Sequence, residues 1–287
     1  MNDKAAAAIP TDSDEVDTAV PRGFLRPEDV ALGQRFLGDG YVIQSVDDKD
    51  ALEKIRDAVV AQAAQHLGVG DPGPGEAFLN KIHERVEVAD LNALRLEVYN
   101  TVNAESWMRE AYFNLARQSL ESLVGNELAM QRRVNLSIQL PNDDSSLLPV
   151  HADVWSGDSP FEIVVWLPLV DCHRTKSMYL LPPGPDRSVS GRLHEFASQS
   201  AEDLFKAIEG DVEWIDIRFG EVLLFAQSLM HGNRINREPD TRWSMNCRFK
   251  SLFSPYADKR LGEFFEPITV RPATRLGMDY ALPGGFE

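Results

Sequence analysis

The sequence predicts an α+β protein built on a jelly-roll barrel, and the prediction depends on two observations. Between about residues 47 and 125, apolar side chains recur at the spacing of helices. From Arg132 onward the pattern changes to period two and to short apolar runs, which are typical of strands. A chain with helices first and strands afterwards favours a β core with helices packed on its outside.

Three helices are predicted in the N-terminal half. The first can be capped by Asp47 or Asp48. Its apolar stripe consists of Leu52, Ile55, Val59 and Ala63. The second carries a stripe of Leu91, Leu94 and Val98. The third begins near Glu105, presents Met108, Tyr112, Leu115 and Leu123, and ends at Gly125. We assign all three stripes to packing against the outside of the barrel.

The second half contains the predicted strands. They cover residues 133–139, 161–170, 178–181, 212–219, 221–227 and 241–249. The run at 161–170 is almost entirely apolar, as in a strand buried on both faces. Residues 212–219 and 221–227 flank Gly220 and predict two strands joined by a tight turn. A helical insertion is expected at 194–208.

No internal domain boundary is visible in the sequence. Residues 1–22, an alanine run followed by proline and acidic residues, predict a disordered tail. Residues 23–287 are expected to form a single domain. Its parts are a helical scaffold at 23–130, the jelly-roll core at 131–253 and a C-terminal extension at 254–287.

Composition restricts the class of protein. Lys and Arg number 29 against 45 Asp and Glu, and the resulting net charge of −16 argues against nucleic acid or an anionic membrane as partner. Cys172 and Cys247 lie in apolar strands and are expected to be buried free thiols in a reducing compartment. No apolar run approaches the length of a membrane span. We expect a soluble, cytoplasmic protein, and the sequence carries no signal of its oligomeric state.

Three residues predict a metal site. His151 and Asp153 are two positions apart, and on an extended segment such residues point the same way. His231 would supply a third ligand from a distant strand. Two histidines and one carboxylate occupy one face of an octahedron and leave the opposite face open. This arrangement suits non-haem Fe(II), which needs vacant positions for a co-substrate and for O₂.

The strand after His231 adds an anion-binding pattern. Its alternate residues share one face: Arg242, Ser244, Asn246 and Arg248. An arginine fork with a hydroxyl beside it suits bidentate capture of a carboxylate, such as the far end of a dicarboxylate.

A second strand repeats the polar alternation. Its polar residues are Arg133, Asn135, Ser137 and Gln139. This face could point to solvent, or it could line the lumen of a barrel whose apolar face is covered by helices. We favour the lumen, because Arg242 and Ser244 are otherwise hard to explain.

Taken in order, these motifs resemble those of the Fe(II)- and 2-oxoglutarate-dependent oxygenases. The matching motifs are His151-x-Asp153, Gly220-Glu221 leading a strand, His231-Gly232 and Arg242-x-Ser244. The resemblance covers about residues 132–253. Within that superfamily, residues 139–160 look most like oxygenases found sporadically in carbohydrate-biosynthesis clusters, and more distantly like the phytanoyl-CoA dioxygenase group.

The resemblance implies a cupin-like double-stranded β-helix and a set of roles. His151, Asp153 and His231 match the iron ligands. Arg242 and Ser244 match the pair that holds the distal carboxylate of 2-oxoglutarate. Thr175 and Ser177 lie where relatives place a further hydroxyl, and Lys176 could serve instead. The implied reaction is a dioxygenase reaction, with Fe(II), 2-oxoglutarate and O₂, that releases succinate and CO₂. Related halogenases lack the carboxylate ligand, so hydroxylation or a similar oxidation is expected here.

The substrate is expected to be small and polar. The expected lumen face offers Arg133, Asn135, Gln139 and Arg248. An apolar acyl chain would leave such groups without hydrogen-bond partners, at a cost of about 1–3 kcal/mol each. A sugar or sugar derivative, with an anionic group that Arg133 or Arg248 could bind, fits better. Trp155 could close over the mouth of the site or be a core aromatic.

Three alternatives stay open. The same oxygenase chemistry could act on an acyl or natural-product substrate. A Zn²⁺-dependent hydrolase or isomerase could use the same ligands, but it would give Arg242 and Ser244 no role and lacks an obvious general base. A non-catalytic cupin-like binding module would leave the triad unexplained.

Overall fold

The computed structural model describes residues 23–283, so the predicted tail at 1–22 lies outside the described residues. The helices are α1 (Pro27–Asp39), α2 (Lys49–His66), α3 (Gly75–Asn80), α4 (Val88–Ala104), α5 (Met108–Asn114), α6 (Arg117–Leu123), α7 (Pro183–Ser190), α8 (Ala201–Ile208) and α9 (Pro272–Met278), with short 3-10 turns η1 (Ile82–Glu84), η2 (Asp153–Ser156), η3 (Arg174–Lys176) and η4 (Leu193–Phe196). The strands are β1 (Tyr41–Ser45), β2 (Leu128–Gln131), β3 (Asn135–Gln139), β4 (Glu162–Pro168), β5 (Tyr179–Leu180), β6 (Glu213–Trp214), β7 (Glu221–Ala226), β8 (His231–Gly232), β9 (Arg242–Ser251) and β10 (Phe265–Pro267).

The larger sheet is antiparallel and has the order β1-β7-β4-β9-β2-β10, with β3 also paired to β9. β9 is its longest strand and pairs with β4 from Ser244 to Lys250. On the other side of β9, β3 pairs with its first half and β2 with its second half. The β3–β9 register places Ser137 opposite Ser244, so the two polar faces predicted separately form one continuous surface.

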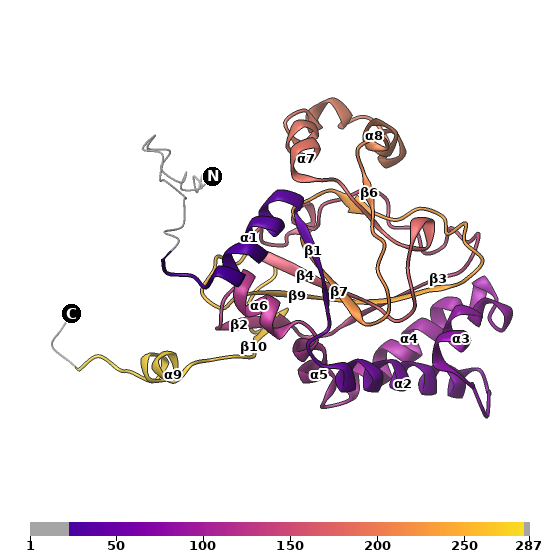
Figure 1. Cartoon of the computed structure of the whole chain (residues 1–287), viewed down its shortest axis with the longest axis horizontal. Coiled ribbons are helices and arrows are strands. Elements are labelled where there is room, and N and C mark those ends of the chain that lie inside the picture. The colour runs from indigo at the N-terminus through magenta and orange to yellow at the C-terminus, as the bar shows by residue number, and fades with distance from the viewer. Residues whose placement is uncertain (1–22, 284–287) are drawn as a thin grey trace, which may run out of the picture.

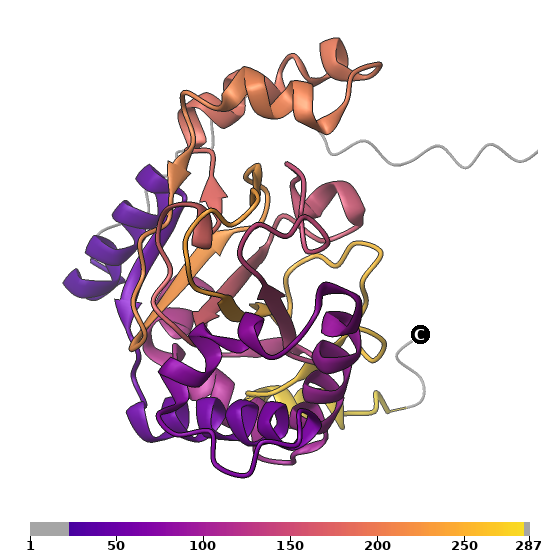
Figure 2. The ribbon, with the colours of Figure 1, turned by 90° about the vertical axis from the view of Figure 1, so that its right-hand side faces the viewer.

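The smaller sheet has the order β6-β5-β8. Figures 1 and 2 place it with α7 and α8 at one end of the molecule, opposite the layer formed by α2 to α5. The predicted hairpin around Gly220 is wrong, because β6 pairs with β5 and not with β7. Gly220 still turns the chain, with φ of +104°.

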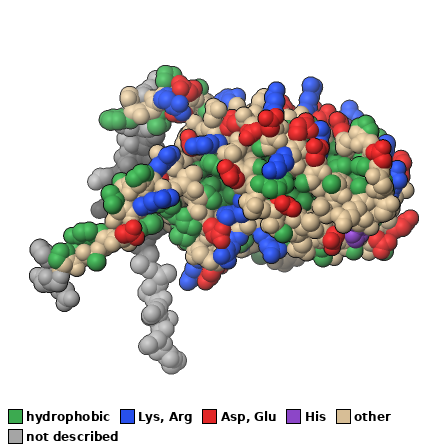
Figure 3. Space-filling model, turned by 90° about the horizontal axis from the view of Figure 1, so that it is seen from below, with side chains coloured by type: hydrophobic (Ala, Val, Ile, Leu, Met, Phe, Trp, Pro, Cys, Tyr) green, Lys and Arg blue, Asp and Glu red, His purple; other side chains and the backbone are tan. Residues whose placement is uncertain are grey.

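Helices α2, α4 and α5 share a hydrophobic core with the larger sheet. Asp48 caps α2 by accepting a hydrogen bond from the Ala51 amide at 2.9 Å. The predicted stripes of α2 and α4 are buried in the same hydrophobic core as β9. Tyr112 fastens α5 to the sheet, since its hydroxyl donates to the Val165 carbonyl at 2.9 Å. The outer face of this layer carries interspersed acidic and basic side chains (Figure 3).

The predicted order, helices followed by a strand-rich half, is confirmed, and the paired strands of both sheets are antiparallel. The third predicted helix is divided into α5 and α6, and α1 and β1 were not predicted. The strands form two sheets, and the pairing stops short of a single closed barrel within residues 23–283. Cys172 and Cys247 are buried and unpaired. None of the described helices has the length and apolar character needed to cross a membrane.

Candidate metal centre

The backbone brings the three predicted metal ligands together. His151 and His231 form an antiparallel bridge, in which each amide donates to the other's carbonyl, at 3.0 and 2.8 Å. The chain stays extended through Ala152, and the Asp153 amide then donates to the Gln227 carbonyl at 3.0 Å. Residues 151–153 therefore run alongside the segment that ends in β8.

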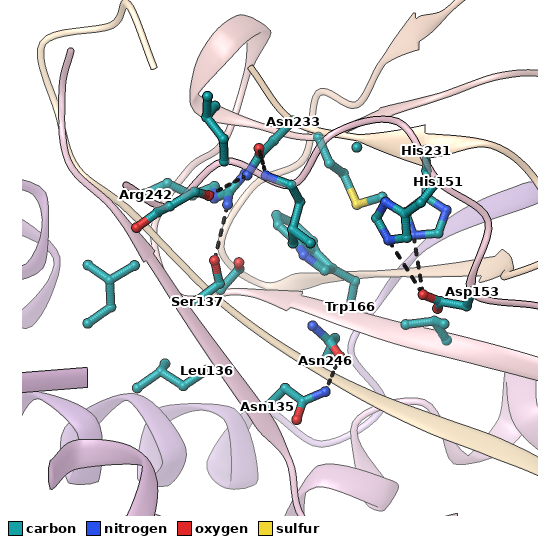
Figure 4. Close-up of a pocket in the computed structure, with 18 of the residues that line it drawn as sticks. Asn135, Leu136, Ser137, His151, Asp153, Trp166, His231, Asn233, Arg242 and Asn246 are labelled. Atoms are coloured by element: carbon teal, nitrogen blue, oxygen red, sulfur yellow. Dashed lines mark hydrogen bonds and ion pairs between the residues drawn. The ribbon is translucent and has the colours of Figure 1, made fainter. Parts of the chain in front are cut away.

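The side chains of the triad face one another (Figure 4). Each imidazole Nδ1 is hydrogen-bonded at 2.8 Å to a backbone carbonyl, that of Pro149 for His151 and that of Leu229 for His231. These bonds leave the Nε2 atoms 3.5 Å (His151) and 3.9 Å (His231) from Asp153 Oδ1. One ligand atom from each residue lies within 4.8 Å of the others, so the triad could hold a metal ion.

Burial and mutual charge set the protonation of these ligands. Burial and the nearby His151 lower the pKa of His231 to about 4. Burial disfavours the charged form of Asp153, but the hydrogen bond from His151 and the charge of Arg248 outweigh it and hold the pKa of Asp153 well below its ordinary value. At neutral pH His231 is therefore neutral and Asp153 ionised, which are the forms that bind metals.

Gly232 allows the chain to pass close to its neighbours at this point. A Cβ atom there would lie 2.6 Å from the Tyr179 hydroxyl and 2.8 Å from the Leu148 carbonyl oxygen. Any side chain would therefore push β8 away from β5 and shift His231.

A second feature of the site is a buried cation, the guanidinium of Arg242. Arg242 donates from Nη1 to the Ser177 carbonyl and from Nη2 to Ser137 Oγ, both at 3.1 Å. Burial lowers the pKa of Arg242 to about 10, so the side chain is still charged at neutral pH. Among the residues that the structure describes, no carboxylate lies within ion-pair distance of it. A buried, unneutralised guanidinium predicts an anionic ligand.

Three buried polar atoms near this cation have no hydrogen-bond partner. They are Arg242 Nε, Ser177 Oγ and Ser244 Oγ. Buried polar groups almost always have partners, so three such atoms around one cation indicate a missing polar ligand. A carboxylate, which accepts several hydrogen bonds and neutralises the charge, fits these donors.

The metal centre and Arg242 line one pocket of about 440 Å³, a volume typical of small-molecule sites. Asn135 and Asn246 lie on its sheet wall, where the Asn135 amide donates to Asn246 Oδ1 at 2.9 Å. Other lining residues were not predicted from the sequence: Arg95 of α4, the loop 145–148, Trp166, Met178, Phe225 and Asn233. Their place over the pocket depends on tertiary packing.

Several predicted site residues do not line this pocket. Arg133 is exposed and directed to Asn100, at 3.4 Å. Gln139 is buried and donates to the Arg234 carbonyl at 2.7 Å. Trp155 is 45% exposed and lies outside the pocket.

Two cationic residues that were predicted to bind co-substrate or substrate contact other residues instead. Buried Lys176 donates to Asn80 Oδ1 at 2.7 Å, away from the pocket. Arg248 lines the pocket, but it is paired with Asp153 at 2.8 Å and is not free to bind an anionic substrate group.

Comparison with known proteins finds similarity in the fold and not in the sequence. No family model matches the sequence, and no curated relative matches it. Among solved structures, the non-heme monooxygenase ThoJ is similar in its nickel complex (TM-score 0.53, 17% identity) and in its apo form (0.54, 16%), each comparison covering 84% of both chains. AviO1 from Streptomyces viridochromogenes is similar with a TM-score of 0.50 and 14% identity, over 81% of this chain and 99% of that one. The chain shares the fold of these proteins.

Proposed function

We propose that the protein is an Fe(II)- and 2-oxoglutarate-dependent oxygenase that hydroxylates or otherwise oxidises a small polar metabolite. One observation carries the proposal: a two-histidine, one-carboxylate triad shares a pocket with a buried arginine that lacks a counter-charge. The first feature suits non-haem iron and the second suits a dicarboxylate.

The triad residues would hold the iron. Their Nδ1 bonds to backbone carbonyls fix the rings so that both Nε2 lone pairs face Asp153 Oδ1. Three ligands leave vacant positions for the co-substrate and O₂. With these bound, the metal would supply the oxidation of a substrate C–H bond while 2-oxoglutarate is converted to succinate and CO₂.

Arg242 would bind the distal carboxylate of 2-oxoglutarate. Its Nε and the hydroxyl of Ser244 are unpartnered and belong to residues that line the pocket, whereas Ser177, whose hydroxyl is also unpartnered, is fully buried and does not line it. Ser137 already accepts from Nη2 and would hold the guanidinium in place. The keto-acid end would then lie toward the metal.

The substrate would be a sugar or sugar derivative. Further polar residues that line the pocket are Asn135, Ser145, Ser146, Asn233, Asn246 and Arg95. Arg95 is exposed and donates to Asn92 Oδ1 at 2.6 Å, and among the described residues it forms no ion pair, so it could bind an acidic group of the substrate. The amides of Asn135 and Asn233 are already hydrogen-bonded within the protein, so the Asn246 amide nitrogen, the Ser146 hydroxyl and Arg95 are the groups left for a hydroxyl-rich molecule. An acyl chain that buried these groups would leave them unpaired at about 1–3 kcal/mol each.

We further propose that the two sheets are the halves of one jelly roll and belong with the helical scaffold to a single domain. The proposal is supported by the origin of the site residues, because His231 lies on β8 of the smaller sheet and Arg242 on β9 of the larger one.

The proposed function is tested with purified protein under anaerobic conditions. Addition of Fe(II) and then 2-oxoglutarate should produce a weak visible absorption band, and admission of O₂ should release succinate. The Arg242→Ala variant should lose both signals at the same 2-oxoglutarate concentration. Tight Zn²⁺ binding without a 2-oxoglutarate band would instead support a hydrolase or isomerase.

A further inference from the structure

The carboxylate of Asp153 presents its two oxygens to different partners. Oδ1 faces the metal side, 3.5 Å from His151 Nε2 and 3.9 Å from His231 Nε2. Oδ2 is 2.8 Å from Nη2 of Arg248. Arg248 was predicted from the sequence to bind substrate, but this contact gives it a different role.

Arg248 is itself held from several sides. Its Nε donates to Gln227 Oε1 at 3.0 Å and lies 3.3 Å from Asp158 Oδ1. Its Nη1 donates to Gln131 Oε1 at 3.3 Å. Gln227 is fully buried, and its amide nitrogen donates to Glu162 Oε2 at 2.7 Å. Because every nitrogen of the guanidinium has a partner, Arg248 can scarcely turn away from Asp153.

Gln227 connects both parts of this arrangement. Its backbone carbonyl accepts the amide of Asp153, and its side-chain oxygen accepts from Arg248. Gln227 therefore contacts both the segment that carries the carboxylate and the guanidinium, and it holds Arg248 together with Asp158 and Gln131.

The charges around Arg248 also balance one another. Asp158 is almost completely buried and pairs with both Arg248 and Lys259. The two carboxylates, Asp153 and Asp158, and the two cations, Arg248 and Lys259, therefore have no net formal charge, and Asp153 is not the sole counter-charge of Arg248.

We propose that Arg248 is a positioning residue that confines Asp153 to one-oxygen coordination of the metal. With Oδ2 held by Arg248, only Oδ1 can reach the ion, and the position that a second carboxylate oxygen would occupy stays open for the co-substrate. The inference rests on the metal site of the proposed function.

The test uses Mn²⁺ alone, with bound water counted by water-proton relaxation. The wild-type protein should show about three exchangeable waters, because an octahedral ion has about three positions left by three ligand atoms. In Arg248→Met the freed Oδ2 should also bind, and the count should fall to about two. Chelation by 2-oxoglutarate takes two positions, so adding it should leave about one water on the wild-type ion and about none on the ion of Arg248→Met. Arg248→Lys, which keeps a donor for Oδ2, should restore most of the wild-type count.

The exposed Arg133→Met variant is the matched control and should behave as wild type. A wild-type water count in folded Arg248→Met overturns the inference. If that variant does not fold, Arg248→Gln is counted in the same way, because its shorter polar side chain should release Oδ2, and a wild-type water count there overturns the inference. Failure of Mn²⁺ to bind the wild-type triad would contradict the proposed function itself.

Discussion

His151 and His231 are cross-strand neighbours that exchange both backbone hydrogen bonds, and their ring centroids lie 4.3 Å apart. The bridge is made by main-chain atoms, so replacing either imidazole should leave the two segments paired. The ligand geometry is therefore present in the fold before any ion binds.

The first prediction concerns the metal. Replacing His151, Asp153 or His231 by Ala should abolish Mn²⁺ binding and leave the fold intact. At about 100 times the dissociation constant, the ion should stabilise the wild-type protein by about 2.7 kcal/mol, measured by thermal unfolding with and without chelator. Exposed His194→Ala should keep the full effect. A His231→Ala protein that is stabilised as strongly as wild type would contradict the assignment.

The second prediction concerns 2-oxoglutarate. Losing a desolvated charged contact costs roughly 2–5 kcal/mol, so Arg242→Ala should raise the dissociation constant on the order of a hundredfold or more. Ser244→Ala should have a smaller effect, because a neutral hydrogen bond contributes about 1 kcal/mol. Isothermal titration of the Mn²⁺ protein measures both, with Arg133→Ala as control. Equal affinity in wild type and Arg242→Ala would show that the carboxylate binds elsewhere.

The third prediction concerns the substrate. Succinate release should be stimulated by nucleotide sugars or acidic sugars, because the pocket wall offers amides and Arg95. For an acidic substrate, Arg95→Ala should raise KM more than it lowers kcat, since Arg95 would contact a group remote from the reacting bond. Stimulation only by fatty acyl thioesters or hydrophobic terpenoids would refute a polar substrate.

The fourth prediction concerns Gly232. An alanine there would approach the Tyr179 hydroxyl and the Leu148 carbonyl too closely, so Gly232→Ala should destabilise the fold by about 1–3 kcal/mol and weaken Mn²⁺ binding. Gly33→Ala in α1 is the control, because no atom lies within 4 Å of its added Cβ and alanine favours helix by about 1 kcal/mol. Equal unfolding midpoints of Gly232→Ala and wild type would exclude the steric explanation.

The sequence was most informative where a local pattern determines the structure. The Asp48 cap, the buried stripe of α2 and the apolar run of β4 follow from spacing alone. The triad could be proposed because His151 and Asp153 are close in sequence and the resemblance supplied a distant partner in His231.

The errors concern partners that are distant in sequence. Alternation placed Arg248 on the polar face of β9, but it could not show that Asp153 and Asp158 would pair with it. Arg133 precedes β3 and lies outside the part of the polar face that covers the pocket. Arg95 falls outside the apolar stripe of α4, and only the packing of that helix brings it to the pocket.

β9 contributes Arg242 at one end of the pocket and Arg248, the partner of Asp153, near the metal centre. The pairing of Ser244 to Lys250 with β4 fixes the register of this strand. A slip of β9 by one residue would turn all its side chains to the opposite face, so a single register error would remove Arg242 from the pocket and Arg248 from Asp153 together.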